Sequence, residues 1–186
     1  MCKGYEIMNK RVLILHGWGG SDFPHWQAHT ARDLIKDNYI VSFPELPNKE
    51  LPTLDEWMNF LEKEFNHFKP DIVVCHSLAN VLWFHFVNKF NIKSIDKLML
   101  VAPVSNENKI KEIETFLPYP IVDNLKAKEI IMVGSTNDPY MTKNEIMKLQ
   151  SQLNIGLKIL DDAGHINADS GFGELSCATE WIKREI

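Results

Sequence analysis

Cysteine is scarce in this chain: the three that it has, Cys2, Cys75 and Cys177, lie far apart and form no CxxC pair. This spacing argues against a disulfide framework or a structural zinc site and is typical of a reducing compartment. The first residues also lack the apolar stretch of a secretory signal. We therefore expect a cytoplasmic protein in which residues 1–7 form a short flexible extension.

Excess positive charge and long apolar runs are missing as well. The chain has 20 Lys and Arg against 25 Asp and Glu, a net charge of −5. A nucleic-acid or anionic membrane surface calls for clustered basic residues. The apolar runs stay under about ten residues, whereas a bilayer span needs about 20. We predict no nucleic-acid partner and no membrane contact.

Short apolar, β-branched runs alternate with amphipathic stretches along all 186 residues, a length typical of one domain. The expected strands are 12–16, 40–43, 72–75, 98–102, 130–133 and 157–160. The expected helices are 26–36, 54–68, 78–90, 143–153 and 175–183. This alternation predicts a three-layer α/β/α sandwich with a mainly parallel sheet and no cap domain.

One irregular segment, residues 104–128, leaves the carboxyl end of an expected strand. Ligands bind beyond the carboxyl ends of the strands in open α/β sheets. The segment is too short for a second domain, so we predict a small flap over a pocket. Its aromatic residues Phe116 and Tyr119, together with Trp18, are the expected lining of that pocket.

Ser77 lies at a strand-to-helix corner, between an apolar run ending at Cys75 and the helix expected from Leu78. A sharp turn there exposes the hydroxyl, as a nucleophilic serine requires. A serine at such a place is also a common helix N-cap. Because Cys75 and Ala79 are small, strand and helix can approach closely, and this favours the nucleophile.

A glycine-rich loop, Gly17-Trp18-Gly19-Gly20-Ser21, follows the first expected strand. In a serine hydrolase such a loop donates one backbone N–H to the oxyanion, here from Trp18, and Leu78 donates the other. The alternative is a tight turn without a catalytic role. The loop lacks the GxGxxG spacing and the Gly-Lys-Ser/Thr of a nucleotide cradle.

Asp138 follows the fifth expected strand and His165 the sixth. His165 could act as the general base for Ser77, with a carboxylate fixing its tautomer. Asp161 and Asp162 are alternative candidates for this carboxylate, but they directly precede the histidine loop. Asp138 is favoured because its strand end can lie beside the histidine loop. The alternative for His165 is a surface loop histidine.

His25 and His29 have the four-residue spacing of a helical metal pair. The HExxH pattern is absent and no third ligand is evident, so we predict no metal and no other cofactor.

Several separated blocks resemble the YdeN-like, or retinoblastoma-binding-protein-nine-like, family of small serine hydrolases with the α/β-hydrolase fold. These blocks are residues 17–21 with 25–27, 76–78, 102–103, 135–140, and 164–167 with 170–173. The resemblance covers nearly all of the chain from Val12 onward. It implies a capless hydrolase that uses Ser77, Asp138 and His165.

The resemblance further implies an esterase or peptidase acting on small acyl esters or amides, with the esterase favoured. The chain departs from the GxSxG elbow, because Cys75 and Ala79 replace the two glycines. Cysteine at this crowded corner predicts a strained or shifted elbow and puts the turnover rate in question. The alternative function is a protein-binding module on a hydrolase scaffold, favoured by Cys75 and the aromatic flap.

Overall fold

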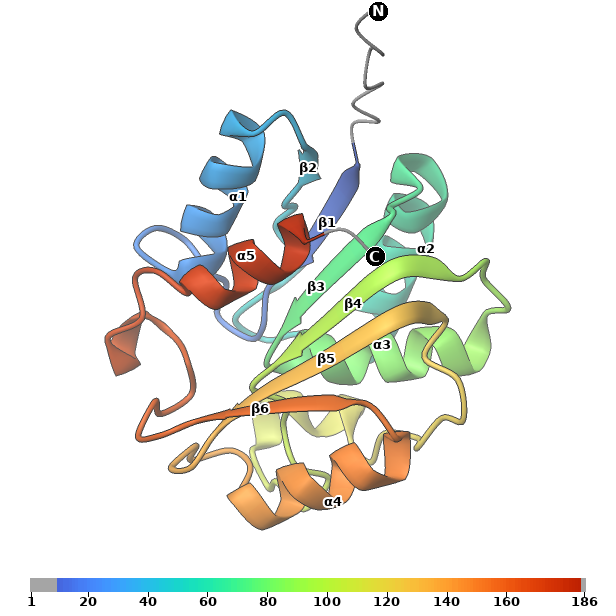
Figure 1. Cartoon of the computed structure of the whole chain (residues 1–186). Helices are drawn as coiled ribbons and strands as arrows, with labels where there is room; N and C mark the ends of the chain where they lie inside the picture. Colours follow the sequence, from blue (N-terminus) through green and yellow to red (C-terminus); the bar gives the residue numbers. More distant parts are fainter. Residues whose placement is uncertain (1–9, 185–186) are drawn as a thin grey trace, which may run out of the picture.

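A computed structural model describes residues 10–184 of the chain (Figure 1). The predicted extension at residues 1–7 lies outside the described residues. Within this described range, six strands form one sheet and all of its pairings are parallel. They are β1 (Arg11–Leu15), β2 (Ile40–Ser42), β3 (Ile72–His76), β4 (Ile95–Val101), β5 (Ala127–Ser135) and β6 (Gly156–Leu160).

The strand order, β2-β1-β3-β4-β5-β6, reverses direction once. The chain runs outward from β1 to β2, then crosses back to β3 and continues to the opposite edge. Loops leaving the carboxyl ends of β1 and β3 therefore turn away from each other, which opens a crevice at this topological switch point. Ser77 directly follows β3, so the fold places it beside that crevice.

The two faces of the sheet are covered by the five α-helices of residues 10–184 (Figure 1). One apolar core holds the buried side chains beneath α2, α3 and α4, and the other holds those beneath α1 and α5. The predicted three-layer sandwich is confirmed. The helices are α1 (Trp26–Lys36), α2 (Leu54–Phe68), α3 (Leu78–Lys89), α4 (Lys143–Leu153) and α5 (Ser176–Lys183).

Helix boundaries follow local capping chemistry. The hydroxyl of Thr53 accepts a hydrogen bond from the N–H of Glu56 at the start of α2, and Thr142 forms a reciprocal capping box with Glu145 at the start of α4. The bounds of α1, α2 and α4 coincide with the predicted ranges. Strands β4 and β5 begin three residues earlier than predicted, because charged residues such as Lys97 join the sheet there.

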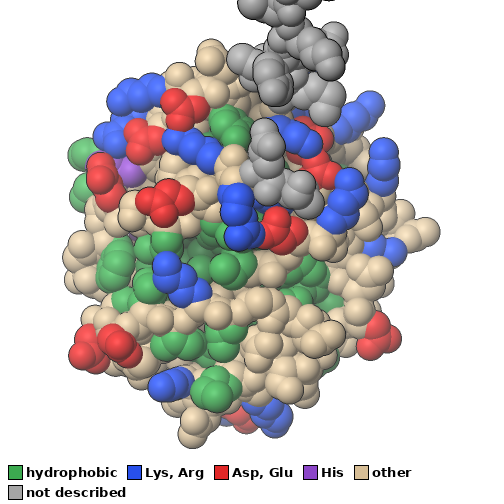
Figure 2. Space-filling model, in the orientation of Figure 1, with side chains coloured by type: hydrophobic (Ala, Val, Ile, Leu, Met, Phe, Trp, Pro, Cys, Tyr) green, Lys and Arg blue, Asp and Glu red, His purple; other side chains and the backbone are tan. Residues whose placement is uncertain are grey.

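The segment after β4 contains a 3₁₀ helix, η1 (Lys111–Phe116), and a second one, η2 (Ala168–Ser170), follows the histidine loop. Figure 2 shows side chains of both charge signs interspersed on the face viewed in Figure 1, with hydrophobic side chains gathered over the strands below α5. Within residues 10–184, no helix has both the length and the apolar character that crossing a membrane requires.

Candidate active site

Ser77 occupies the turn between β3 and α3 with a strained backbone, φ 55° and ψ −123°. Non-glycine residues rarely adopt such angles, and they persist only where the surroundings hold them. The side chain of Ser77 makes no capping hydrogen bond to α3. Ser77 thus occupies the N-cap position of α3 without capping the helix by its side chain, and the hydroxyl is free to meet another group.

The turn is held by buried polar contacts. The N–H of Ser77 donates to the Val101 carbonyl over 2.9 Å. The Asn80 amide, fully buried in the first turn of α3, donates to the carbonyls of Ser77 and Val101, each over 2.8 Å. The sequence analysis did not single out Asn80. A carboxamide inside an otherwise apolar helix could have indicated it, because a buried carboxamide needs hydrogen-bond partners.

Gly17 permits the close approach of the first loop to the serine. A Cβ at this position would lie 2.6 Å from the Ser77 Cβ and 3.1 Å from its Oγ. Contacts this short force atoms apart, so only glycine fits here without displacing Ser77. The glycine therefore matters for approach rather than for positive φ, which Gly19 and Gly20 supply in the same loop.

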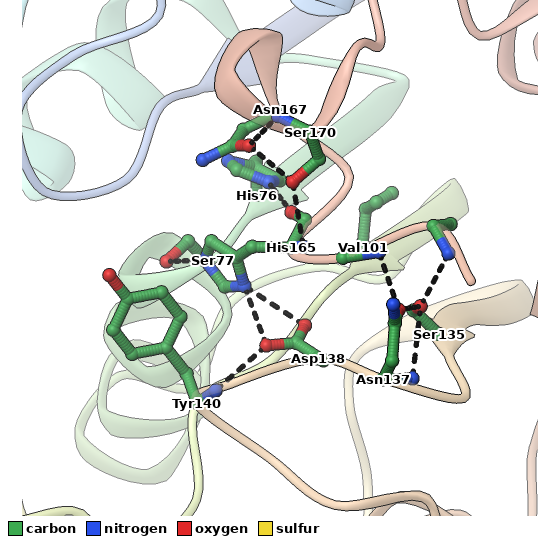
Figure 3. Close-up of polar contacts among 12 residues, drawn as sticks. His76, Ser77, Val101, Ser135, Asn137, Asp138, Tyr140, His165, Asn167 and Ser170 are labelled. Carbon is green, nitrogen blue, oxygen red and sulfur yellow. Dashed lines mark hydrogen bonds and ion pairs between the residues drawn. The ribbon is translucent and has the colours of Figure 1, made fainter.

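The imidazole of His165 connects Ser77 to Asp138 (Figure 3). Its Nε2 lies 2.7 Å from the Ser77 Oγ, and its Nδ1 lies 3.0 and 2.9 Å from the two Asp138 carboxylate oxygens. All three residues are buried. The N–H of Tyr140 also donates to Asp138 over 2.9 Å, which orients the carboxylate. By contrast, Asp161 and Asp162 are exposed.

Hydrogen bonds tie the loop that carries Asp138 to the loop that carries His165 (Figure 3). The Ser135 hydroxyl accepts from the N–H of Ala163 over 3.0 Å, and the side-chain Oδ1 of Asn137 accepts from the N–H of Gly164 over 2.7 Å. The backbone of Gly164 has φ 53°, and a Cβ there would meet the Ser170 hydroxyl at 2.4 Å. Glycine is thus required beside the histidine.

Three imidazoles lie side by side with their planes tilted to one another, with ring centroids 4.8 Å apart for His25 and His76 and 5.1 Å apart for His76 and His165. The His76 Nε2–H donates to the His165 carbonyl over 3.0 Å. Burial holds the pKa of His76 well below its ordinary value and lowers the pKa of His25 to about 4. Both rings therefore stay neutral beside His165 at pH 7.

His16 fixes the shape of the loop after β1. Its Nδ1–H donates to the Gly17 carbonyl over 2.7 Å, and its Nε2 accepts from the N–H of Leu46 over 2.8 Å. Trp18 follows directly, and its indole N–H donates to the Glu50 carbonyl over 2.9 Å. The two residues predicted to bind the oxyanion, Trp18 and Leu78, both border the cavity in front of Ser77.

That cavity measures about 330 Å³, small for a ligand site, and Ser77 and His165 both reach it. Its apolar side belongs to the core beneath α2–α4, and its polar side comes from the loops after β1 and β6. Other residues that line the cavity include Trp18, Ser21, Asp22, His25, His76, Leu78, Val104, Ile110, Ile113, Asn167 and Asp169.

The sequence profile of the serine hydrolase family matches residues 12–184. The chain belongs to this family. No curated protein matches it. The hydrolase contains, in addition, a serine, an imidazole and a carboxylate in hydrogen-bonding contact at the carboxyl edge of its sheet.

Solved structures resemble the hydrolase in fold. The ydeN gene product of Bacillus subtilis is 21% identical with a TM-score of 0.81, covering 93% of this chain and 96% of that one. A candidate YdeN-like hydrolase from Pectobacterium atrosepticum is 22% identical with a TM-score of 0.76, covering 93% and 89%. A carboxylesterase from Nitrososphaera gargenis is 9% identical with a TM-score of 0.63, covering 85% and 84%.

The structure does not place Phe116 and Tyr119 in the cavity wall of the hydrolase, contrary to the sequence prediction. Phe116 is fully buried against Trp57, with ring centroids 5.2 Å apart, and Tyr119 packs on Phe84 at the same separation. The 3₁₀ turn of η1 aligns Ile113 with Phe116, so both point inward, and Ile113 reaches the cavity instead.

Cys75 packs in the core of the hydrolase with no exposed surface, paired in register with Leu15 and Leu100. Burial raises the pKa of its thiol, so it stays protonated. Over residues 10–184, no three His, Cys, Asp or Glu side chains lie together as a metal ion would need. His25 instead caps α1, with its Nδ1 accepting from the Gln27 N–H.

Proposed function

We propose that this serine hydrolase is a carboxylesterase for small acyl esters that works through an acyl-enzyme. Ser77 is the nucleophile, His165 the general base and acid, and Asp138 the group that orients His165. The single observation that carries the proposal is the imidazole of His165, which lies 2.7 Å from the Ser77 hydroxyl and 2.9 Å from Asp138. This is the contact order of a catalytic triad.

The proposed reaction has two halves. The Ser77 Oγ attacks the ester carbonyl while its proton passes to the His165 Nε2, and the carbonyl oxygen becomes an oxyanion. The backbone N–H groups of Trp18 and Leu78 receive that charge; the Leu78 N–H opens α3, where the helix dipole adds to it. As the carbonyl re-forms, the acyl–oxygen bond breaks and His165 gives its proton to the leaving alcohol.

Water completes the cycle. It attacks the acyl carbon of the Ser77 ester, and His165 takes one of its protons. The acyl–Ser77 bond then breaks, the proton returns to Ser77, and the carboxylic acid leaves. The carboxylate of Asp138 accepts the Nδ1–H throughout and stabilises the transient imidazolium.

Ester substrates are favoured over amides because the site offers little to help a poor leaving group. The cavity is small and opens to the surface. Esters of short acids fit its volume, and an alcohol leaves more readily than an amine. Matched butyrate ester and butyramide substrates test this preference, with the ester expected to turn over faster.

A fluorophosphonate probe tests the nucleophile directly. The wild-type protein should be labelled at Ser77, and the Ser77→Ala variant should lose both the label and esterase turnover, by about 10⁶-fold in kcat. Ser151→Ala, on the exposed face of α4, is the control and should label normally. Labelling that survives Ser77→Ala, or a folded wild-type protein that takes no label, would contradict the proposal.

A further inference from the structure

The cavity has two chemically different walls. The apolar wall consists of Trp18, Leu78, Val104, Ile110 and Ile113, all part of the core beneath α2–α4 or packed against it. The polar wall consists of Ser21, Asp22, His25, His76, Asn167 and Asp169. A substrate that fills the cavity must therefore present one apolar part and one polar part.

Two buried groups of the polar wall lack a partner within residues 10–184. They are the Ser21 hydroxyl and the His25 Nε2, and each residue is only 5% exposed. Buried polar atoms in folded proteins nearly always have hydrogen-bond partners, so each exception calls for an explanation. Because both residues line the cavity, a bound molecule can supply what the protein does not.

The tautomer of His25 defines what it offers. Its Nδ1 accepts from the Gln27 N–H over 3.2 Å at the start of α1. The proton of the neutral ring must then be on Nε2, which makes this atom a donor. The Ser21 hydroxyl can donate or accept. Together they suit an uncharged oxygen such as a hydroxyl group.

The polar wall lies on the same side of the cavity as His165. His25 and His76 both pack against Trp26, which belongs to the core beneath α1 and α5. Ala163 and Ile166, which flank His165, pack in that same core. In ester cleavage His165 gives its proton to the leaving oxygen, so the alcohol part of the substrate must lie on this side.

We propose that the polar wall binds the alcohol part of the substrate and that this alcohol carries further hydroxyl groups, while the apolar wall binds a short acyl chain. The substrates are thus polyol esters of short fatty acids. This inference rests on the proposed esterase function. The breaking acyl–oxygen bond releases the polyol, which leaves with the proton from His165.

Charge on the polar wall excludes an acidic alcohol. Asp22 and Asp169 line the cavity, and no Lys or Arg among the described residues does. The nearby ammonium of Lys49 lies 3.6 Å from Asp22 and 3.3 Å from Glu45, so carboxylates outnumber it. A substrate carboxylate would meet like charges there, whereas neutral hydroxyls can donate to them.

The experiment compares two esters that differ only in the hydroxyl groups of the alcohol, 2,3-dihydroxypropyl butyrate and propyl butyrate. The wild-type kcat/KM should favour the diol ester by about tenfold, the worth of one or two hydrogen bonds. Carboxymethyl butyrate, the acidic ester, should be hydrolysed more slowly than either.

Two variants remove the donors separately. Ser21→Ala deletes the hydroxyl, and His25→Asn removes Nε2–H while retaining a side chain that caps helices well. Each should lower the diol preference by about three- to tenfold. His29→Asn, one turn further along α1 and outside the cavity lining, is the control and should keep the wild-type ratio. Melting curves check that each variant is folded.

Turnover of both butyrates at equal rates, or a diol preference that survives Ser21→Ala and His25→Asn, would overturn this inference and leave the esterase function standing. Rapid hydrolysis of the acidic ester would overturn it as well. Turnover of neither butyrate, with no fluorophosphonate label, would overturn both the inference and the function on which it rests.

Discussion

Gly17→Ala should disable the site without unfolding the protein. The added Cβ would lie 2.6 Å from the Ser77 Cβ, whereas carbon atoms in contact prefer about 3.5–4.0 Å. The loop and the elbow must therefore separate by about 1 Å. A displacement of this size at a reacting group costs about 10²-fold in rate, or about 3 kcal/mol of barrier.

The matched control is Gly19→Ala in the same loop. A Cβ there has nothing within 4 Å, but the backbone φ of 79° is strained for alanine. This strain costs about 1–2 kcal/mol of stability, similar to the cost of overpacking at Gly17. The two variants should thus melt at similarly lowered temperatures and differ in activity.

The assay measures kcat/KM on a short-chain ester together with the melting temperature. Gly17→Ala should lose about 10²-fold in kcat/KM, and Gly19→Ala should lose much less. A folded Gly17→Ala protein with wild-type kcat/KM would refute the reasoning, because the short contact would then have been relieved without moving Ser77. Equal losses in both variants would refute it too, since strain alone would explain them.

Three further predictions follow from buried groups. Asp138→Asn should lower kcat about 10⁴-fold with little change in melting temperature, because the amide favours the wrong tautomer of the imidazole; a near-normal kcat would remove Asp138 from the triad. Lys97→Met should destabilise the fold by about 1–3 kcal/mol in urea titrations, because its buried ammonium donates to the Trp181 carbonyl over 2.9 Å at the end of α5. The control variant Lys183→Met, in a partly exposed ion pair with Asp37, should cost under about 1 kcal/mol, and an equal loss in both would argue against the buried contact. Acid should also destabilise the protein: unfolded His25 takes a proton near pH 6.5, but the folded ring resists until about 4. The stability that this group contributes is therefore fully present above about pH 6.5, and roughly 3 kcal/mol of it is lost as the pH drops from 6.5 to about 4. His25→Asn should flatten that decline in urea titrations at each pH.

The sequence predicted the architecture well because its signals are local. Continuous apolar runs define the central strands, and Thr53 with Glu56 marks where α2 begins. The beginning of β4 was not predicted because Lys97 looks like a surface residue, and that of β5 because Lys128 and Glu129 do. The Lys97 ammonium can be buried because carbonyls at the C-terminal end of α5, more than 80 residues away, accept hydrogen bonds from it. No local pattern encodes such a partner.

The candidate site also has one part that the sequence predicts and one part that it does not. Ser77, Asp138 and His165 each follow a strand, and the parallel sheet brings strand ends to one edge, so their contact could be expected from order alone. The side chains of the 104–128 segment could not be placed in this way. Phe116 belongs to no α-helical or strand period in the sequence, and whether it faces the cavity or the core is decided by its packing against Trp57.

Asp138 and His165 follow the adjacent strands β5 and β6, and hydrogen bonds to the side chains of Ser135 and Asn137 join their two loops. Ser77 follows β3, which lies two strands away from β5. Thermal motion of this edge of the sheet should then move Asp138 and His165 together as a pair. The hydrogen bond from the His76 Nε2–H to the His165 carbonyl links this pair to the end of β3, next to Ser77. Catalytic readiness should accordingly depend on the separation between imidazole and hydroxyl, which this link restrains.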